Sequence, residues 1–248
     1  MIKTVKKIIP LPIYRFLLKI YLYLRFVSDF CKFTKINDFR FSVSWKDRYP
    51  QLFDNIKETP FENHYTYHPA WASRIVSKIT PKVHIDISST LNFCTIVSAF
   101  VPVNFYDYRQ ANLNLSNLKT EYADLLNLPF ADNSIESISC MHTIEHIGLG
   151  RYGDPIDPKG DLKAIDELKR VLAPGGSLIF VVPVGYPKIQ YNAHRIYSYK
   201  MVINYFKELK LEEFSLIKES GDEGVIKNAT EKMADNEHYG CGCFWFKK

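Results

Sequence analysis

The sequence predicts an α/β fold, a doubly wound and mostly parallel sheet of seven strands preceded by an N-terminal helical arm. At 248 residues and 46% hydrophobic, the chain can form one large domain with an appendage, and it is not disordered, collagen-like or disulfide-stapled. From residue 69 onward, strand-like and helix-like stretches alternate, as they do in βαβ units. Residues 1–40 hold nine basic and two acidic residues, a charge of +7 that leaves −2 of the total +5 to the rest.

The first element is the arm, residues 1–60, which precedes a domain at residues 61–248. A helix is expected at residues 11–28, with Arg15, Lys19 and Arg25 beside a broad aliphatic and aromatic face. That face suits either packing on the domain or binding to an anionic membrane surface, and the sequence leaves both open. These basic residues interrupt the apolar stretch and no cleavage site follows, so a cytoplasmic protein is expected, peripheral on the inner membrane face in the second case.

The domain elements follow from their apolar patterns. Strands are expected at residues 83–87, 103–108, 120–124, 135–141, 177–184, 213–219 and 241–247, and helices at 69–79, 92–100, 161–172 and 199–209. The helix at 161–172 has the clearest stripe, and the sequence Ala-Pro-Gly-Gly at 173–176 is expected to end it.

Carboxylates end the first three strands: Asp86, Asp107 and Asp124. Open α/β sheets bind ligands beyond the carboxyl ends of their strands, and an acidic residue about 20 positions after the first strand end can hold ribose hydroxyls. Asp107 follows Asp86 by 21 positions. Each carboxylate alone is more often a turn or helix cap, but the three together predict a nucleoside pocket.

Residues 84–184 then resemble the class I S-adenosylmethionine-dependent methyltransferases. The resemblance is carried by His84-Ile85-Asp86, Asp107, the stretches at 123–130 and 132–138, and Glu-Leu-Lys-Arg-Val-Leu-Ala-Pro-Gly-Gly-Ser-Leu at 167–178. With residues 146–155 and 192–195, the chain also looks like a smaller methyltransferase-like family of unknown function, whose members often accompany genes for surface polysaccharides.

The resemblance implies S-adenosylmethionine as the cofactor. It implies that Asp86, Ser88 and Ser89 lie along the methionine moiety and that Asp107 holds the ribose. It also places Asp124 and Leu125 at the adenine edge and His142 beside the cofactor. The family's glycine-rich loop is here Ser88-Ser89-Thr90, so a serine occupies the position of the key glycine. A serine in left-handed backbone costs about 1 kcal/mol or more, so the loop is expected to follow a different path.

Histidines dominate the acceptor side. Methyl transfer to a hydroxyl needs a base, and His142, His146 and His194 are the candidates, each with a structural role as its alternative. The 14-residue loop from Gly148 is expected to be a lid, because compact domains seldom hold so long a loop without a function. The candidate acceptor-binding residues are Arg151, Tyr152, Asp154, Asn192, His194 and Arg195.

Two patterns suggest a metal but are given less weight. The residues His142, Glu145 and His146 spell the inverted zinc-protease signature, yet Gly148 and Gly150 would break the helix that the signature requires. Cys-Gly-Cys at 241–243 is explained by alternation in a last strand. No metal site is therefore expected.

The function expected from these observations is S-adenosylmethionine-dependent O-methylation of a sugar or phosphate-linked group in a capsule or lipopolysaccharide precursor. The alternative is a catalytically idle methyltransferase fold that serves as a binding or membrane-adaptor module. No nucleic-acid partner is expected because the body is net acidic. The oligomeric state does not follow from the sequence.

Overall fold

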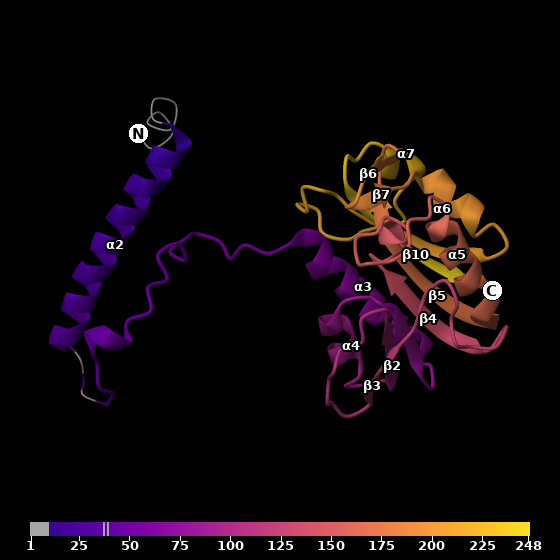
Figure 1. Cartoon of the computed structure of the whole chain (residues 1–248), viewed down its shortest axis with the longest axis horizontal. Helices are drawn as coiled ribbons and strands as arrows, with labels where there is room; N and C mark the ends of the chain where they lie inside the picture. The colour runs from indigo at the N-terminus through magenta and orange to yellow at the C-terminus, as the bar shows by residue number, and fades with distance from the viewer. Residues whose placement is uncertain (1–9, 37, 39) are drawn as a thin grey trace. The chain divides into compact units, whose positions relative to one another are not determined.

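The chain is described from a computed structural model that covers residues 10–36, 38 and 40–248, in two compact units, Met1–Pro60 and Phe61–Lys248 (Figure 1). In the first unit, helix α2 spans Leu11–Ile36 and the 3₁₀ helix η1 spans Trp45–Asp47. The ring of Trp45 packs against Phe30 at 5.0 Å between centroids. α2 is longer than the expected 11–28, because no proline or glycine interrupts residues 29–36 and Asp29 pairs with Arg25. Lys3, Lys6 and Lys7 of the predicted basic arm lie outside the described residues.

No residue of α2 is buried, and several of its large apolar side chains, among them Phe16, Leu17 and Leu24, are exposed. Among the described residues, no helix combines the length and apolarity that crossing a bilayer requires.

The second unit is built on an eight-stranded sheet in the order β3-β2-β1-β4-β5-β10-β8-β9. The strands span Leu118–Tyr122 (β3), Val103–Asp107 (β2), His84–Ile87 (β1), Ile135–Met141 (β4), Leu172–Val184 (β5), Gly240–Lys247 (β10), Lys210–Ile217 (β8) and Ile226–Lys227 (β9). β1 to β5 pair in parallel, while β10 is antiparallel to both β5 and β8. The doubly wound, mostly parallel class is confirmed, and each of the seven expected strands is present.

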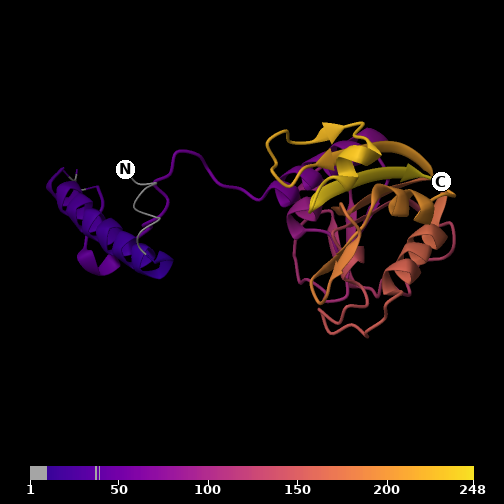
Figure 2. The ribbon, with the colours of Figure 1, turned by 90° about the horizontal axis from the view of Figure 1, so that it is seen from above.

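Helices cover both faces of this sheet (Figures 1 and 2). α3 (Asn63–Ile79) and α4 (Leu91–Val97) form one apolar core with Trp71, Phe93 and Val97. α5 (Gly160–Val171), α6 (Tyr199–Tyr205) and α7 (Glu231–Asp235) contribute to the core on the other face, where Leu168 and Phe206 are fully buried. A β6–β7 hairpin (Lys188–Gln190 and His194–Ile196) and the 3₁₀ helix η2 (Ile144–His146) complete the unit.

Several expected boundaries shift. α3 begins six residues before the expected start at 69, because Glu62 caps it by accepting from the Tyr65 amide and Pro69 is accommodated inside the helix. α5 ends at Val171, just before the stretch 173–176 that was expected to end it, but this stretch lies within β5, which begins at Leu172. Gly175 takes a φ of 76° there and its amide donates to the carbonyl oxygen of Lys248 at 2.8 Å, which ties the strand to the chain end.

Candidate active site

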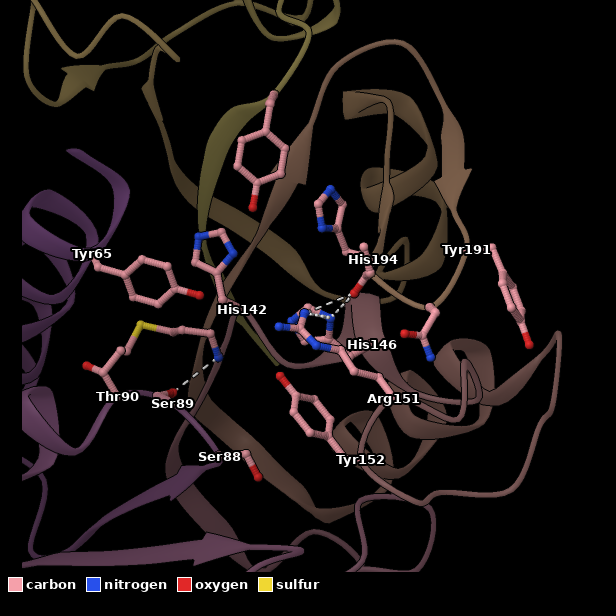
Figure 3. A pocket seen from close by; sticks show the side chains of 14 residues that line it. Tyr65, Ser88, Ser89, Thr90, His142, His146, Arg151, Tyr152, Tyr191 and His194 are labelled. Carbon is pink, nitrogen blue, oxygen red and sulfur yellow. Dashed lines mark hydrogen bonds between the residues drawn. The ribbon is translucent and has the colours of Figure 1, made fainter. Parts of the chain in front are cut away.

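Two adjacent cavities open where the carboxyl ends of β1, β2 and β4 meet. The larger has a volume of about 650 Å³ and the smaller about 150 Å³. Four residues line both of them: Ser88, His142, His146 and Tyr152. In the view of the larger cavity in Figure 3, Tyr65 lies on one side and His194 and Arg151 on the other, with His142 between them.

The smaller cavity collects predicted cofactor residues from the ends of four strands, β1 to β4. Asp107, Asp124 and Leu125 line it together with Ser88 and His142. Asp107 accepts a hydrogen bond from the Arg109 amide at 2.7 Å, and Asp124 accepts one from the Leu126 amide at 2.9 Å. Each carboxylate thus shapes its own turn and still lies on the cavity wall. Asp124 follows β3 by two residues instead of ending it.

The loop Ser88-Ser89-Thr90 has left-handed backbone at its first serine, although this conformation is unfavourable for a residue with a Cβ. Ser88 has a φ of 55°, and its amide donates to the Tyr106 carbonyl oxygen at 2.8 Å. The prediction that this loop avoids that conformation is therefore wrong at Ser88. Ser89 accepts from the Met141 amide at 3.2 Å, and Thr90 caps α4, so contacts on both sides fix the strained residue.

Asp86 lies beneath this loop and not in either cavity. It is fully buried, accepts from the Ser89 amide at 3.0 Å and from the Ser139 hydroxyl, and its pKa is raised by burial to about 6. His84 is also fully buried and contacts the hydroxyls of Ser137 and Ser139 at 2.7 and 2.8 Å. Burial lowers the pKa of His84 to about 3. Asp86 thus holds the loop from below, through Ser89.

His142 stands at the end of β4 in left-handed backbone, with a φ of 53°. Its Nδ1 lies 2.9 Å from Oε1 of Glu145, which is 1% exposed. Because an ionised carboxylate only accepts, Nδ1 carries the proton and Nε2 is left as the basic nitrogen. Nε2 lies 3.4 Å from Sγ of Cys241 on β10.

His146 follows on η2 and is fixed differently. Its Nδ1 donates to the Ala193 carbonyl oxygen at 2.6 Å, and the Arg151 guanidinium donates to the same oxygen at 3.1 Å. Nε2 is therefore the basic nitrogen, 3.9 Å from the Glu145 carboxylate. The zinc-protease signature is not realised, because its residues span a strand end and a single 3₁₀ turn instead of one helix.

The predicted lid is an ordered loop over the smaller cavity. Asp154 accepts from the amides of Gly148, Gly150 and Tyr152 at 2.7, 3.4 and 3.1 Å, so this carboxylate folds its own loop. The ring of Tyr152 meets His146 edge-on at 5.6 Å between centroids. The Arg109 guanidinium lies 4.4 Å from the Tyr152 ring centroid, so the loop contacts the end of β2.

Some residues of the β6–β7 hairpin line the larger cavity, and another is buried away from it. Asn192 and His194 line the larger cavity, and burial lowers the pKa of His194. Arg195 does not line either cavity. It is 5% exposed and donates to the carbonyl oxygens of Ile147 at 2.6 Å and, at 3.4 Å, Glu145. Its Nε lies 3.6 Å from the Asp161 carboxylate.

The structure adds aromatic residues to the site. Tyr65 from α3 lines the larger cavity, and its ring centroid lies 5.3 Å from that of His142. Tyr239, just before β10, also lines the cavity and packs on His64 and His194, at 5.1 and 4.9 Å between centroids. No motif singles out Tyr239, because only the return of β10 beside β5 brings it to the site.

Comparison with known proteins finds limited sequence similarity. Residues 103–222 match a family described as Caenorhabditis protein of unknown function, DUF268. An uncharacterised protein of Methanocaldococcus jannaschii is 35% identical over 60 residues, which are 24% of this chain and 21% of that protein. The match therefore spans about a fifth of the archaeal protein.

Solved structures are similar over most of the chain. The 1,6-didemethyltoxoflavin-N1-methyltransferase of Burkholderia thailandensis, solved with 1,6-didemethyltoxoflavin and S-adenosylhomocysteine, has a TM-score of 0.52 at 9% identity. The match covers 73% of this chain and 78% of that one. A SAM-dependent methyltransferase of Thermotoga maritima gives a TM-score of 0.49 at 15% identity, over 74% of this chain and 91% of that one. The chain thus has the Rossmann-like fold of S-adenosylmethionine-dependent methyltransferases.

Proposed function

We propose that the protein is an S-adenosylmethionine-dependent methyltransferase that methylates a hydroxyl group. The observation that carries the proposal is the pair of adjacent cavities, one lined by the carboxylates of two strand ends and the other by histidines and tyrosines. The fold supports it, because nucleosides bind at this edge of such sheets. When bound, S-adenosylmethionine supplies an electrophilic methyl group on a sulfonium.

The side chains of the smaller cavity suit the nucleoside part of this cofactor, which would extend from its roughly 150 Å³ into the adjacent larger cavity. Asp107 would accept hydrogen bonds from the ribose hydroxyls, and Asp124 and Leu125, which line the same cavity, would contact the adenine edge. Ser88 and Ser89 line the larger cavity beside this one and would border the methionine part. Isothermal titration of the full chain with S-adenosylhomocysteine tests this assignment, and absence of binding would reject it.

His146 is the best candidate for the base that removes the acceptor proton. It lines both cavities, and the Ala193 carbonyl oxygen fixes its tautomer so that Nε2 is free to accept. The Glu145 carboxylate, 3.9 Å from Nε2, would stabilise the imidazolium after proton transfer. His142 is less suited, because its Nε2 already faces Cys241.

The larger cavity suits a polar, hydroxyl-rich acceptor such as the sugar of a capsule or lipopolysaccharide precursor. Tyr65, Asn192 and Tyr239 offer hydrogen-bonding groups, and Arg151 adds a positive charge for a phosphate-linked group. Transfer of radiolabelled methyl groups into extracted nucleotide-linked or lipid-linked glycans tests this acceptor class. Binding of the cofactor without such transfer would reject the acceptor but keep the cofactor site.

We further propose that the N-terminal unit binds an anionic membrane surface. Such binding is also what the alternative function, a membrane adaptor without catalytic activity, would require. The support is α2, where Phe16, Leu17 and Leu24 are exposed on the same helix as Arg15 and Lys19. Co-sedimentation with phosphatidylserine vesicles at low salt tests this. Equal recovery of the wild type and an Arg15→Glu, Lys19→Glu double variant with the vesicles would contradict it.

A further inference from the structure

His142 belongs to a cluster of three side chains that can bind a metal ion. One ring nitrogen each of His64 and His142 and the Sγ of Cys241 lie within 4.8 Å of one another, and all three residues are buried. They come from α3, the end of β4 and β10, so the fold and not a local motif brings them together.

The spacing is close to that of a tetrahedral zinc site. With Zn–S of about 2.3 Å and Zn–N of about 2.0 to 2.1 Å, tetrahedral geometry places sulfur and nitrogen ligands about 3.5 Å apart. Sγ of Cys241 and Nε2 of His142 are 3.4 Å apart. The three ligand atoms lie within 4.8 Å of one another, so the ring of His64 must move by about 1 Å to complete the tetrahedral spacing.

The surroundings of His142 are those of a metal ligand. Metal-binding histidines commonly donate their second ring N–H to a carboxylate, which fixes the tautomer and raises the basicity of the ligating nitrogen. Glu145 accepts from Nδ1 of His142 and so directs Nε2 toward Cys241.

Two polar atoms near the cluster lack hydrogen-bond partners among the described residues. Oε2 of Glu145 and Nε2 of His68 are both buried without a partner. The His68 ring lies 4.9 Å from that of His142, and its Nδ1 donates to the His64 carbonyl oxygen. Buried polar groups are usually satisfied, so these atoms indicate a missing positive charge or ligand.

We propose that His64, His142 and Cys241 bind one Zn²⁺ ion, with a fourth coordination position left for an oxygen ligand from the larger cavity. Thiolate and imidazole ligands favour Zn²⁺ over Mg²⁺ or Ca²⁺. Binding releases the thiol proton of Cys241 to solvent, and no redox change occurs. The fourth position would take the acceptor hydroxyl, a role that rests on the proposed methyltransferase activity.

The residues that surround the cluster indicate that the fourth coordination position of the ion faces the larger cavity. Tyr65 and Tyr239, which both line the cavity, pack on His142 and His64 at 5.3 and 5.1 Å between ring centroids. His142 itself forms part of the wall. An ion bound to Nε2 of His142 would therefore lie beside the larger cavity, where the acceptor is proposed to bind.

Cobalt substitution tests the site without any activity. The full chain, stripped with a chelator and titrated with Co²⁺, is expected to show a thiolate-to-cobalt charge-transfer band and the visible bands of a tetrahedral ion at one equivalent. Zn²⁺ is expected to displace them. Cys241→Ser should remove the charge-transfer band, and His64→Ala should weaken Zn²⁺ binding at least tenfold.

Matched controls are the exposed Cys31 and His238. Cys31→Ser and His238→Ala should keep the full spectrum, and Cys243→Ser should keep it too, although its Sγ lies 3.8 Å from that of Cys241. Loss of Co²⁺ binding in Cys243→Ser would show that Cys243 is the fourth ligand and would overturn the proposal that this position is open. A folded wild type that binds S-adenosylhomocysteine but gives no thiolate band with Co²⁺ would overturn the metal site and leave the methyltransferase intact.

Discussion

The carboxylate of Glu145 accepts a hydrogen bond from Nδ1 of His142 at 2.9 Å, and both side chains are almost completely buried. A carboxylate placed in this way selects one histidine tautomer and holds the ring in one orientation. The same carboxylate lies 3.9 Å from Nε2 of His146. Glu145 therefore links the proposed metal ligand to the proposed base.

Replacing Glu145 by glutamine is expected to weaken both roles while preserving shape. The amide does not enforce the His142 tautomer and does not stabilise an imidazolium at His146. Loss of such an outer partner typically lowers metal affinity or activity about 10- to 100-fold. Zn²⁺ titration and methyl transfer by Glu145→Gln measure this, with the exposed Glu136→Gln as the control. Unchanged values for both would contradict the assignment.

Asp107 is expected to contribute to cofactor affinity. Asp107→Asn keeps a side-chain oxygen for the Arg109 amide but removes the charge that would accept from two ribose hydroxyls. Hydrogen bonds to charged groups are worth about 1.5 to 3 kcal/mol, so affinity for S-adenosylhomocysteine should fall about 10- to 100-fold. Calorimetry of this variant and of the exposed Asp222→Asn gives the comparison. Equal affinities would remove Asp107 from the site.

Ser88→Gly is expected to stabilise the fold. Left-handed backbone costs a residue with a Cβ about 1 to 2 kcal/mol, and the greater unfolded-state entropy of glycine offsets about 0.5 to 1 kcal/mol of this. The net gain should be about 0.5 kcal/mol, since the Ser88 amide still donates to the Tyr106 carbonyl oxygen. Ser89→Gly should instead lower the free energy of unfolding, because it removes the acceptor for the Met141 amide. Urea denaturation of both variants should give opposite signs.

Asp86→Asn is expected to change how stability depends on pH. The carboxyl pKa is about 6 in the fold against an ordinary 3.8, so its contribution is fully present below pH 3.8 and is lost as pH rises through 6. The loss amounts to about 3 kcal/mol. His84 contributes a slope of opposite sign, because its pKa is lowered to about 3 and its contribution is lost as pH falls.

The difference in the free energy of unfolding between Asp86→Asn and the wild type therefore reports the contribution of Asp86 alone, because His84 is present in both. Asp86→Asn should gain stability relative to the wild type between pH 4 and pH 7, as measured by urea denaturation at each pH. A constant difference across this range would show that the carboxyl is not perturbed in the fold.

Arg195→Met is expected to destabilise the protein by about 3 kcal/mol, because it removes the cationic partner of the buried Asp161 and leaves that carboxylate only the Tyr197 hydroxyl. It also removes the donor to the Ile147 carbonyl oxygen that holds η2. The exposed Arg74→Met is the control. A variant of normal stability with a raised KM for the acceptor would instead support acceptor binding by Arg195.

The sequence predicted the sheet well because each strand carries its own signal. The strand at 135–141 is found with those bounds, since Ile135, Ile138 and Cys140-Met141 supply apolar side chains along it and Gly and Pro are absent. Boundaries shifted where tertiary contacts decide them, as at α3, where the cap at Glu62 overrides the proline at 69. The β6–β7 hairpin and β9 were not predicted, because strands of two or three residues show no periodicity.

More of the proposed cofactor-binding residues than of the proposed acceptor-binding residues could be predicted from the sequence. Asp107 and Asp124 follow parallel neighbouring strands, so topology alone brings them to one cavity. Cys241 and Tyr239 reach the site only because β10 returns antiparallel to β5, a pairing that no local pattern specifies. Asp86 and Arg195 have the right chemistry at the right place in the chain, yet burial places them behind the site.

The strand-end cavity is proposed to bind the cofactor of a methyltransferase. Isothermal titration of this chain with S-adenosylhomocysteine is the decisive test of that binding. The structure predicts saturable binding at one site per chain that is weakened at least tenfold by Asp107→Asn. A folded protein that shows no binding, or whose binding is indifferent to Asp107, would contradict the account.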